Sequence, residues 1–306
     1  MRYFIPYPRT RRRGKSLSNG GDTLKTVRFT KMHGVGNDYV YIDCMKETPA
    51  DPAYLARIMS PRRFSVGSDG VVLICPSDSC DAKMRMFNAD GSEGKMCGNA
   101  IRCVGKFLYE RGYTSKTELT VETLSGDRRL TLDVRDGKVV SVSVGMGRAI
   151  LAPSEIPVLF RGDAMIDEPV TVDGAEYRIT AVSMGNPHAV TFVPDVGSVE
   201  IDKIGPQFEY LPIFPDRVNT EFVRVLSRDR IEMRVWERGS GETLACGTGA
   251  CASVVASVLN GRCDAGVPVT VGLLGGELVI TCSAGLEVTM TGPAEFVFDG
   301  EFFLDN

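Results

Sequence analysis

The sequence predicts two alike domains, each containing short strands and one main helix, that arose by an internal duplication. The chain has 306 residues, which is enough for two ordinary domains. A shift of 149 residues superposes residues 83–99 on residues 232–248 without a gap. In both copies an alternating strand pattern is followed by a polar loop and then by a helical pattern.

The composition is that of a globular protein with a small partner. Hydrophobic residues make up 43% of the chain and charged residues 24%, and the formal net charge is -4. Because this charge gives no field that would hold a polyanion, we expect no nucleic-acid partner. No apolar run approaches the roughly 20 residues that span a bilayer, so we expect no membrane partner either. The partner that remains is a small-molecule substrate.

The cysteines favour a reducing compartment. There are nine, an odd number that is too sparse for a disulfide scaffold of this length. A cytoplasmic location therefore fits best. Since no paired CxxC occurs and the chain has only two histidines, we expect no metal site.

The chain begins with a segment unlike the rest. Residues 1–25 are rich in Arg, Ser and Gly, and no acidic residue occurs before Asp22. The segment lacks an apolar stretch and a clear amphipathic period, so a disordered basic tail is a better prediction than a transit peptide.

The following elements are predicted from periodicity, in chain order. A helix is expected near residues 52–59, and alternating strands at RMFN (85–88), SVSVGM (141–146), RVWE (234–237) and ELVITC (277–282). Apolar residues recur at helical spacing after Cys97 and again after Cys246. Gly112 and Gly261 suit the ends of these two helices.

Cys97 and Cys246 are therefore predicted at or just before helix N-termini. There the free amides and the positive end of the helix dipole stabilise an anion, such as a thiolate or a bound carboxylate. The other cysteines are more simply read as small buried residues, with Cys80 as an exposed bystander. Glycine follows each of the two duplicated cysteines, and neither residue type adds much packing, so a chemical role is the better interpretation for this pair.

Two facing thiols can invert a carbon atom that lies between them. A thiolate on one face removes the α-proton of a carboxylate substrate, and a thiol on the other face delivers a proton. The two helix N-termini would hold the carboxylate and stabilise the charge that develops on it. This scheme requires no cofactor.

Seven motifs, in order, resemble the diaminopimelate epimerases, and the resemblance covers about residues 26 to 302. The motifs are FTKMHGVGNDYVYID, SVGSDGVVLI, MFNADGSEGKMCGNAIRC, SMGNPHAVTF, RVNTEFV, VWERGSGETLACGTGAC and MTGPAEFVF. The resemblance implies an α+β fold of two pseudo-symmetric domains, each a curved, mostly antiparallel sheet around a central helix. It further implies domains at 26–146 plus 293–306 and at 147–292, because the final strand returns to the first domain.

The resemblance implies pyridoxal-independent epimerisation of LL-2,6-diaminopimelate to the meso isomer, in lysine and peptidoglycan precursor biosynthesis. It assigns the acid/base pair to Cys97 and Cys246, and thiol tuning to His188 and Glu237. The residues that it implies for substrate binding are Asn37, Asn88, Gly98, Asn99, Asn186, Asn219, Glu237, Arg238, Gly247 and Thr248. A homodimer is a further expectation.

Three other functions stay open at this stage. A racemase for proline or hydroxyproline would use the same thiols, but a substrate without a second charged end has no use for both Glu237 and Arg238. A thiol redox protein is disfavoured by the absence of CxxC. A non-catalytic amino-acid binder is disfavoured because both thiols are present.

Asp69 is interpreted as a structural residue of a loop, whose carboxylate accepts hydrogen bonds from the turn backbone.

Overall fold

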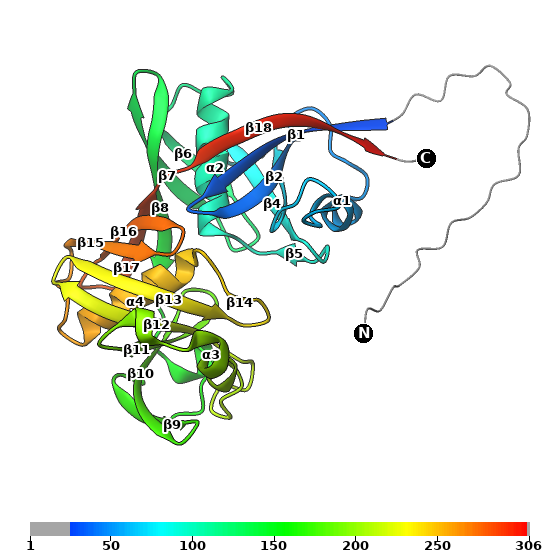
Figure 1. The fold of residues 1–306 in the computed structure, drawn as a ribbon. Coiled ribbons are helices and arrows are strands. Elements are labelled where there is room, and N and C mark those ends of the chain that lie inside the picture. The colour runs from blue at the N-terminus through cyan, green and yellow to red at the C-terminus, as the bar shows by residue number, and fades with distance from the viewer. Residues whose placement is uncertain (1–24, 305–306) are drawn as a thin grey trace, which may run out of the picture.

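The computed structural model describes residues 25–304, so all but the last residue of the predicted basic tail lies outside the described residues. The described chain forms two lobes, which Figure 1 shows one above the other. In this part of the chain no helix is long and apolar enough to cross a membrane.

The first half of the chain supplies seven full strands, one two-residue strand and two helices. They are β1 (Lys25–Gly34), β2 (Asn37–Asp43), α1 (Pro52–Met59), β3 (Gly70–Cys75), β4 (Ala82–Asn88), the two-residue β5 (Glu93–Gly94), α2 (Gly98–Glu110), β6 (Glu118–Glu122), β7 (Arg128–Arg135) and β8 (Lys138–Arg148), with the last strand of this lobe, β18 (Glu295–Leu304), coming from the far end of the chain. The expected helix near 52–59 and the strand at 85–88 are both confirmed.

The second half repeats this order. It contains β9 (Glu168–Val172), β10 (Ala175–Ser183), β11 (Pro187–Phe192), α3 (Ile201–Glu209), β12 (Asn219–Ser227), β13 (Arg230–Glu237), β14 (Gly241–Glu242), α4 (Gly247–Leu259), β15 (Pro268–Leu273), β16 (Gly276–Cys282) and β17 (Glu287–Gly292). Short 3₁₀ turns at Pro153–Glu155 and Val196–Ser198 lie in the connections.

The duplication predicted from the sequence is present in three dimensions. Helices α2 and α4 have bounds that differ by 149 residues, and so do the first residues of α1 and α3. The parallel pairs β2–β3 and β11–β12 match at the same shift, because Tyr39 pairs with Gly70 and His188 with Asn219. Helix α3 was not among the sequence predictions, although the same shift applied to α1 points to it.

The sheet is mostly antiparallel and runs through both lobes. In the first lobe the strands lie in the order β18, β1, β2, β3, β4, β6, β7, β8, and β8 then pairs with β17 of the second lobe. From β17 the order continues through β16, β15, β13, β12, β11 and β10 to β9. Among the strands of residues 25–304, the parallel pairs are β2–β3, β4–β6, β11–β12 and β13–β15.

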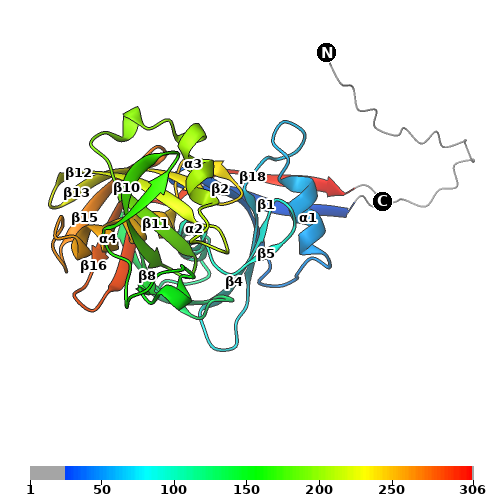
Figure 2. The same ribbon diagram turned by 90° about the horizontal axis from the view of Figure 1, so that it is seen from below.

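Each curved sheet has a central helix on one face and a shorter helix on the other. The buried residues of α2 and α4 belong to one continuous apolar cluster that passes between the lobes. Helix α1 covers the outer face of the first sheet through Leu55, Ala56 and Met59, and α3 covers the second through Ile201 and Phe208. These observations confirm the α+β class with two sheet-rich domains and few helices (Figures 1 and 2).

The last strand returns to the first lobe. β18 pairs antiparallel with β1, from Lys25 opposite Leu304 to His33 opposite Glu295. The two strands run side by side in both views (Figures 1 and 2). Because β8 and β17 join the sheets without a break, the residue boundaries of the two domains stay a prediction.

Candidate active site

Both candidate catalytic cysteines lie at helix N-termini. Cys97 is the N-cap residue of α2 and Cys246 that of α4, each with extended backbone. The Cys246 sulfur accepts a hydrogen bond from the backbone N–H of Gly249, with 3.4 Å between the two atoms. The first amides of each helix have no carbonyl partner one turn back, so they are free to bind an anion.

Close packing between the two helix starts explains why a glycine follows each cysteine. A Cβ atom on Gly98 would lie 2.5 Å from Cε of Met290, and one on Gly247 would lie 3.1 Å from its Sδ. The side-chain amide of Asn99 donates to the carbonyl of Ala245 across the same junction, at 3.4 Å. Small residues therefore let the two helices begin close together at the junction of the lobes, with one cysteine just before each start.

A cavity of about 430 Å³ lies between the lobes at these helix starts. Ligand sites commonly occupy clefts of this kind between domains. Most of the residues that the sequence predicted for the site line it: Asn37, Asn88, Cys97, Gly98, Asn99, Asn186, Glu237, Arg238, Cys246, Gly247 and Thr248.

Two positive side chains of the cavity wall were not predicted. Lys95, before α2, and Arg128, at the start of β7, both line the cavity. Lys95 lies close to Cys97 in the sequence and could have been proposed from that position. Arg128 reaches the cavity together with Ser125 of the β6–β7 connection, which is far from Cys97 in the sequence, so no local pattern indicates it.

The two thiols differ in their electrostatic surroundings. Burial raises the pKa of Cys97, while the backbone amides of Ala100 and Asn99 and the charge of Arg102 act to lower it. Burial raises the pKa of Cys246 well above its usual range, and the carboxylates of Glu237 and Glu221 add to that effect. Burial thus favours the thiol form at both sulfurs, and more strongly at Cys246 than at Cys97.

Glu237 and Arg238 lie at the end of β13, where the strand leaves the sheet toward the cavity. Burial raises the pKa of Glu237, whereas the hydrogen bond from the Thr243 hydroxyl and the charge of His188 lower it. The Arg238 guanidinium donates to the backbone carbonyl of Asp216 at 2.8 Å. Only one of its nitrogens has this contact among the described residues, so the rest of the fork can bind a ligand carboxylate.

His188 and Asn219 lie behind the cavity wall. His188 is fully buried, with Nε2 3.1 Å from Oδ1 of Asn186 and Nδ1 2.7 Å from Oε1 of Glu221. Asn219 is 3% exposed, and its Oδ1 accepts from the backbone N–H of Arg238 at 2.9 Å. The functional roles predicted for these two residues stay predictions.

Glu221 was missed by the sequence analysis. Its carboxylate is fully buried on β12, next to the predicted site residue Asn219. The available signal was a single acidic residue in the apolar run TEFV (220–223). Carboxylates are rarely buried without a partner, so such a residue in a central strand indicates a specific environment.

On the first-lobe side, Asp69 orients Asn37. The Asn37 amide donates to Oδ2 of Asp69 at 2.7 Å, and the backbone N–H of Asp38 donates to the same oxygen at 3.0 Å. This places Oδ1 of Asn37 3.3 Å from the sulfur of Cys97. The interpretation of Asp69 as a loop acceptor is confirmed, and the side chain also fixes an amide that faces a thiol.

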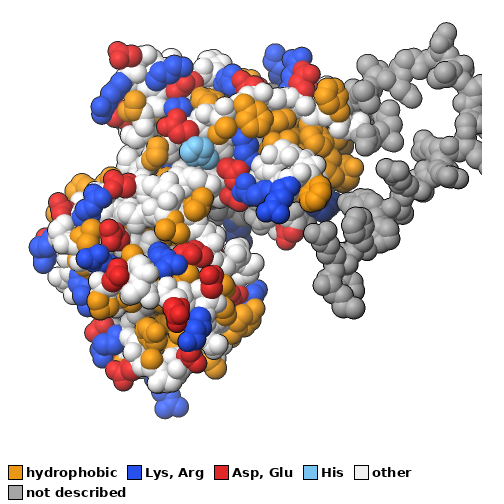
Figure 3. Space-filling model, viewed as in Figure 1, with side chains coloured by type: hydrophobic (Ala, Val, Ile, Leu, Met, Phe, Trp, Pro, Cys, Tyr) orange, Lys and Arg blue, Asp and Glu red, His pale blue; other side chains and the backbone are white. Residues whose placement is uncertain are grey.

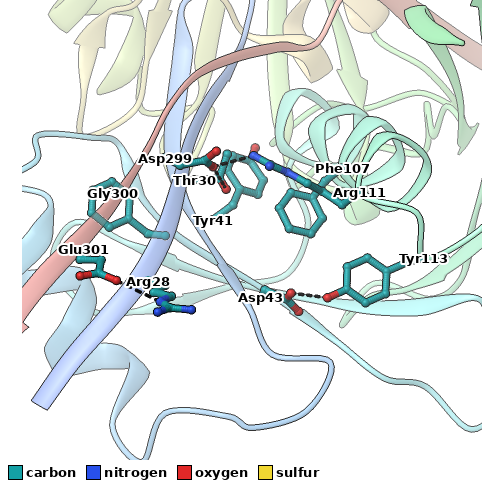
Figure 4. A pocket seen from close by; sticks show the side chains of 11 residues that line it. Arg28, Thr30, Tyr41, Asp43, Phe107, Arg111, Tyr113, Asp299, Gly300 and Glu301 are labelled. Carbon is teal, nitrogen blue, oxygen red and sulfur yellow. Dashed lines mark hydrogen bonds and ion pairs between the residues drawn. The ribbon is translucent and has the colours of Figure 1, made fainter.

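A second cavity, of about 500 Å³, lies against β1, β18 and α2 (Figure 4). Four of its charged side chains form two pairs, Arg111 with Asp299 at 2.6 Å and Arg28 with Glu301 at 3.0 Å, and Asp43 accepts from the Tyr113 hydroxyl. None of the predicted site residues lines it.

On the face in Figure 3 acidic and basic side chains are interspersed over both lobes, in keeping with the net charge of -4.

The arrangement between the lobes suits acid/base chemistry at a carbon atom next to a carboxylate. Two thiols from opposite lobes, two sets of free amides and several amide side chains meet at one cavity. Arg238 and Glu237 add one group for an anion and one for a cation.

Comparisons with known proteins agree on one family. A sequence model of the family "Diaminopimelate epimerase" matches residues 29–152 and 180–297. The diaminopimelate epimerase of Acetivibrio thermocellus is 55% identical over 280 residues, which cover 91% of this chain and 99% of that protein. The diaminopimelate epimerase of Methanococcus maripaludis is 52% identical over 276 residues, covering 90% and 99% of the two chains.

Solved structures share the fold at low sequence identity. A hydroxyproline epimerase from Agrobacterium vitis superposes with a TM-score of 0.68 and 18% identity, covering 92% of this chain and 93% of that one. A phenazine biosynthesis protein from Bacillus anthracis superposes with a TM-score of 0.65 and 16% identity, covering 92% and 100%. At these identities the likeness concerns the fold alone.

Proposed function

Since this chain belongs to the diaminopimelate epimerase family, we propose that its two N-cap thiols carry out the interconversion of LL- and meso-2,6-diaminopimelate. The protein is an isomerase of lysine and peptidoglycan precursor biosynthesis. The observation that carries the residue assignment is that Cys97 and Cys246 cap two helices that open into one cavity between the lobes.

The proton balance of the proposed reaction is as follows. The thiolate of one cysteine takes the α-proton, and the electron pair of the C–H bond spreads into the adjoining carboxylate. The thiol of the other cysteine then gives its proton to the opposite face of the same carbon. One turnover thus inverts one centre and exchanges thiol and thiolate between Cys97 and Cys246, so the reverse reaction starts from the opposite arrangement.

The carboxylate of the reacting centre is proposed to lie on the amides of Gly98, Asn99, Gly247 and Thr248. These groups belong to the first turns of α2 and α4, where the N–H groups lack partners within the helix. Donors aimed at this carboxylate stabilise the charge that it gains in the transition state, with a typical value of about 3 to 4 kcal/mol for one donor.

The other end of the substrate is proposed to lie near Glu237 and Arg238. Diaminopimelate has a second ammonium and a second carboxylate, and these two side chains match them in charge. Asn37, Asn88 and Asn186 can donate and accept without adding charge. Proline has no such second end, which favours diaminopimelate over the racemase alternative.

We also propose a cytoplasmic location and a homodimer. All nine cysteines lie in the described part of the chain and are free thiols, which suits a reducing compartment. Light scattering of the reduced protein measures the oligomeric state directly.

The first experiment follows the α-proton by NMR. Reduced protein is incubated with LL-diaminopimelate in heavy water, and the expected result is loss of the α-proton signal together with appearance of the meso isomer. Proline under the same conditions is expected to exchange nothing. If protein whose thiols are shown to be free by a thiol assay leaves the α-proton signal of diaminopimelate unchanged, the epimerase proposal fails.

A further inference from the structure

Glu221 is a fully buried carboxylate that the proposed reaction does not use. It lies on β12 with 0% of its surface exposed. Its Oε1 is 2.7 Å from Nδ1 of His188, whereas its Oε2 has no hydrogen-bond partner among the described residues. A buried charge with half of its acceptors unpaired carries a desolvation cost, so its retention needs a reason.

A chain of polar contacts connects this carboxylate to a catalytic thiol. From His188, Nε2 lies 3.1 Å from Oδ1 of Asn186. The Asn186 amide donates to the hydroxyl of Thr248 at 3.3 Å, and that oxygen is 3.5 Å from the sulfur of Cys246. Glu221 fixes the orientation of the His188 ring by accepting from Nδ1–H. The ring in turn orients Asn186, and Asn186 orients the Thr248 hydroxyl beside the sulfur.

Helix α4 has a glycine where Glu221 meets it. A Cβ atom on Gly249 would lie 2.6 Å from Oε1 of Glu221 and 3.2 Å from the sulfur of Cys246. The backbone N–H of the same glycine donates to that sulfur at 3.4 Å. Gly249 thus leaves room for the carboxylate directly beneath the N-terminus of α4, where the positive end of the helix dipole stabilises its charge.

The duplication provides an internal comparison. At the shift of 149 residues, Glu221 corresponds to Val72 and His188 to Tyr39, both of which are buried. The first lobe therefore has no charged pair beneath its thiol. At the same shift the buried Arg102 corresponds to Cys251, so the half-site of Cys97 contains a cation where that of Cys246 contains a neutral residue.

We infer that Glu221 is a positioning residue: it orients His188 and, through its charge, keeps the shared proton on Cys246 in the resting enzyme. This inference rests on the proposed function in one respect, because that function supplies the single proton that the two thiols exchange. The effect of the Glu221 charge on Cys246 exists without substrate. A negative charge beside a thiol disfavours the thiolate, whereas a cation beside Cys97 favours it.

The groups that face each thiol support this asymmetry. Around Cys246 they are Glu237 from β13, Glu221 from β12 and the Thr248 hydroxyl of α4, while His188 from β11 contacts Glu221 from behind. Around Cys97 they are Arg102 from α2, Glu237 from β13, Tyr39 from β2 and the neutral Oδ1 of Asn37, with Lys95 and Arg128 in the same cavity wall. The contact with Asn37 favours the thiol, but neutral hydrogen bonds are weaker than charged ones.

The test measures the reactivity of each thiol in the full-length reduced protein without substrate. Iodoacetamide alkylation is followed across pH, and peptide mass spectrometry reports Cys97 and Cys246 separately. In the native protein the midpoint for Cys246 is expected at higher pH than that for Cys97. Glu221→Gln removes the charge and keeps the shape, so the Cys246 midpoint is expected to move to lower pH while the Cys97 midpoint stays unchanged.

The matched control is Glu110→Gln. Glu110 has a side chain only 7% exposed and pairs with Lys106 and Lys138 in the first lobe. This variant is expected to move neither midpoint. A general loosening of the fold would speed alkylation of both thiols together, so an equal change at Cys97 and Cys246 in Glu221→Gln overturns the inference.

A second variant and a second readout complete the test. Glu221→Val installs the residue that the first lobe has at this place, and it is expected to shift Cys246 in the same direction as Glu221→Gln. In epimerisation, Glu221→Gln is expected to lower kcat about tenfold or more with KM within about twofold, because ring orientation matters for proton transfer rather than binding. If the native protein epimerises diaminopimelate but the alkylation midpoint of Cys246 lies at lower pH than that of Cys97, the inference about Glu221 is wrong and the proposed function stands. If the native protein does not epimerise diaminopimelate, the proposed function is contradicted instead.

Discussion

Cys97 and Cys246 differ from the other cysteines in what surrounds the sulfur atom. Cys103 and Cys251 lie inside α2 and α4 and are fully buried in the apolar cluster, where burial raises the pKa of Cys103 to about 11 and that of Cys251 to about 12. Neither lines the cavity between the lobes. Only the N-cap thiols combine cavity access with free helix amides, which is what a proton-transfer role requires.

Replacing either N-cap thiol by a hydroxyl tests the pair directly. We expect Cys97→Ser and Cys246→Ser each to lower kcat by at least about 100-fold, because a serine hydroxyl neither ionises near neutral pH nor gives up its proton as readily. Turnover of LL-diaminopimelate measures this. Cys80→Ser, at a site that lies outside the cavity, is expected to keep native turnover. Full turnover in either N-cap variant rules out the two-thiol scheme.

Glu209 holds the segment that carries Glu237 and Arg238. It is 4% exposed, and it accepts from Nε1 of Trp236 at 2.8 Å, from the backbone N–H of Gly239 at 2.9 Å and from Arg217 at 3.1 Å. Two of these donors flank the predicted binding residues on either side. A buried carboxylate with three donors is therefore a support for the loop rather than a ligand.

Glu209→Gln is expected to raise KM for diaminopimelate about three- to tenfold, with a smaller effect on kcat. One carboxylate oxygen is replaced by an amide nitrogen, which donates and cannot accept, so at least one of the donors loses its partner and the loop loosens. Steady-state kinetics measure the two constants separately. Glu200→Gln, at the exposed start of α3, serves as the control. An unchanged KM contradicts the supporting role.

At the scale of elements, α1 and α3 occupy equivalent places with different packing. Ala56 of α1 lies in the same buried cluster as Phe87 of β4. At the matching positions α3 has Gly205 and β13 has Trp236. A Cβ atom on Gly205 would lie 2.4 Å from the indole ring, so the larger aromatic residue requires the smaller helix residue.

Gly205→Ala is expected to destabilise the protein by about 1 to 3 kcal/mol. Helix propensity alone favours alanine by about 1 kcal/mol, so a loss of stability reports the clash with the rigid ring. Trp236→Phe alone removes one donor to Glu209, so it serves as a second reference protein: in that background, which has the aromatic residue of the first lobe, Gly205→Ala is expected to cost much less than in the native protein. Urea unfolding followed by far-UV circular dichroism measures both. A Gly205→Ala variant as stable as the native protein would falsify the packing argument.

At the scale of the whole molecule, neither lobe holds the site alone. The cavity takes residues from both, β8 pairs with β17 across the junction, and Asn99 of α2 donates to Ala245 before α4. The apolar cluster that contains both central helices is also continuous. The lobes therefore share much of the burial that stabilises each of them.

We expect the two lobes to unfold in one transition. Trp236 is the only tryptophan and lies in the second lobe, so its fluorescence reports that lobe, whereas far-UV circular dichroism reports both. In urea the two signals are expected to have the same midpoint, because separating the lobes exposes the shared cluster. A fluorescence transition displaced from the circular dichroism transition contradicts a shared core.

Periodicity and duplication gave a large part of the fold. The strand at residues 85–88, the helix at 52–59 and the two cysteine-capped helices are where the patterns predict them. Helix α3 was not predicted because Gly205 and Pro206 interrupt its helical pattern. The shift of 149 residues, applied to α1, would have located it.

The sequence by itself determined the duplication, the family, and the two cysteines with the glycines that follow them, because these are features of spacing and residue type. Only the tertiary structure decided which side chains meet the cavity and which support it from behind. Arg128 reaches the wall from the start of β7, and Glu221 reaches His188 because β12 pairs in parallel with β11. Contacts of this kind depend on strand register and on the packing of α4 over the sheet, and neither is encoded in any one stretch of the chain.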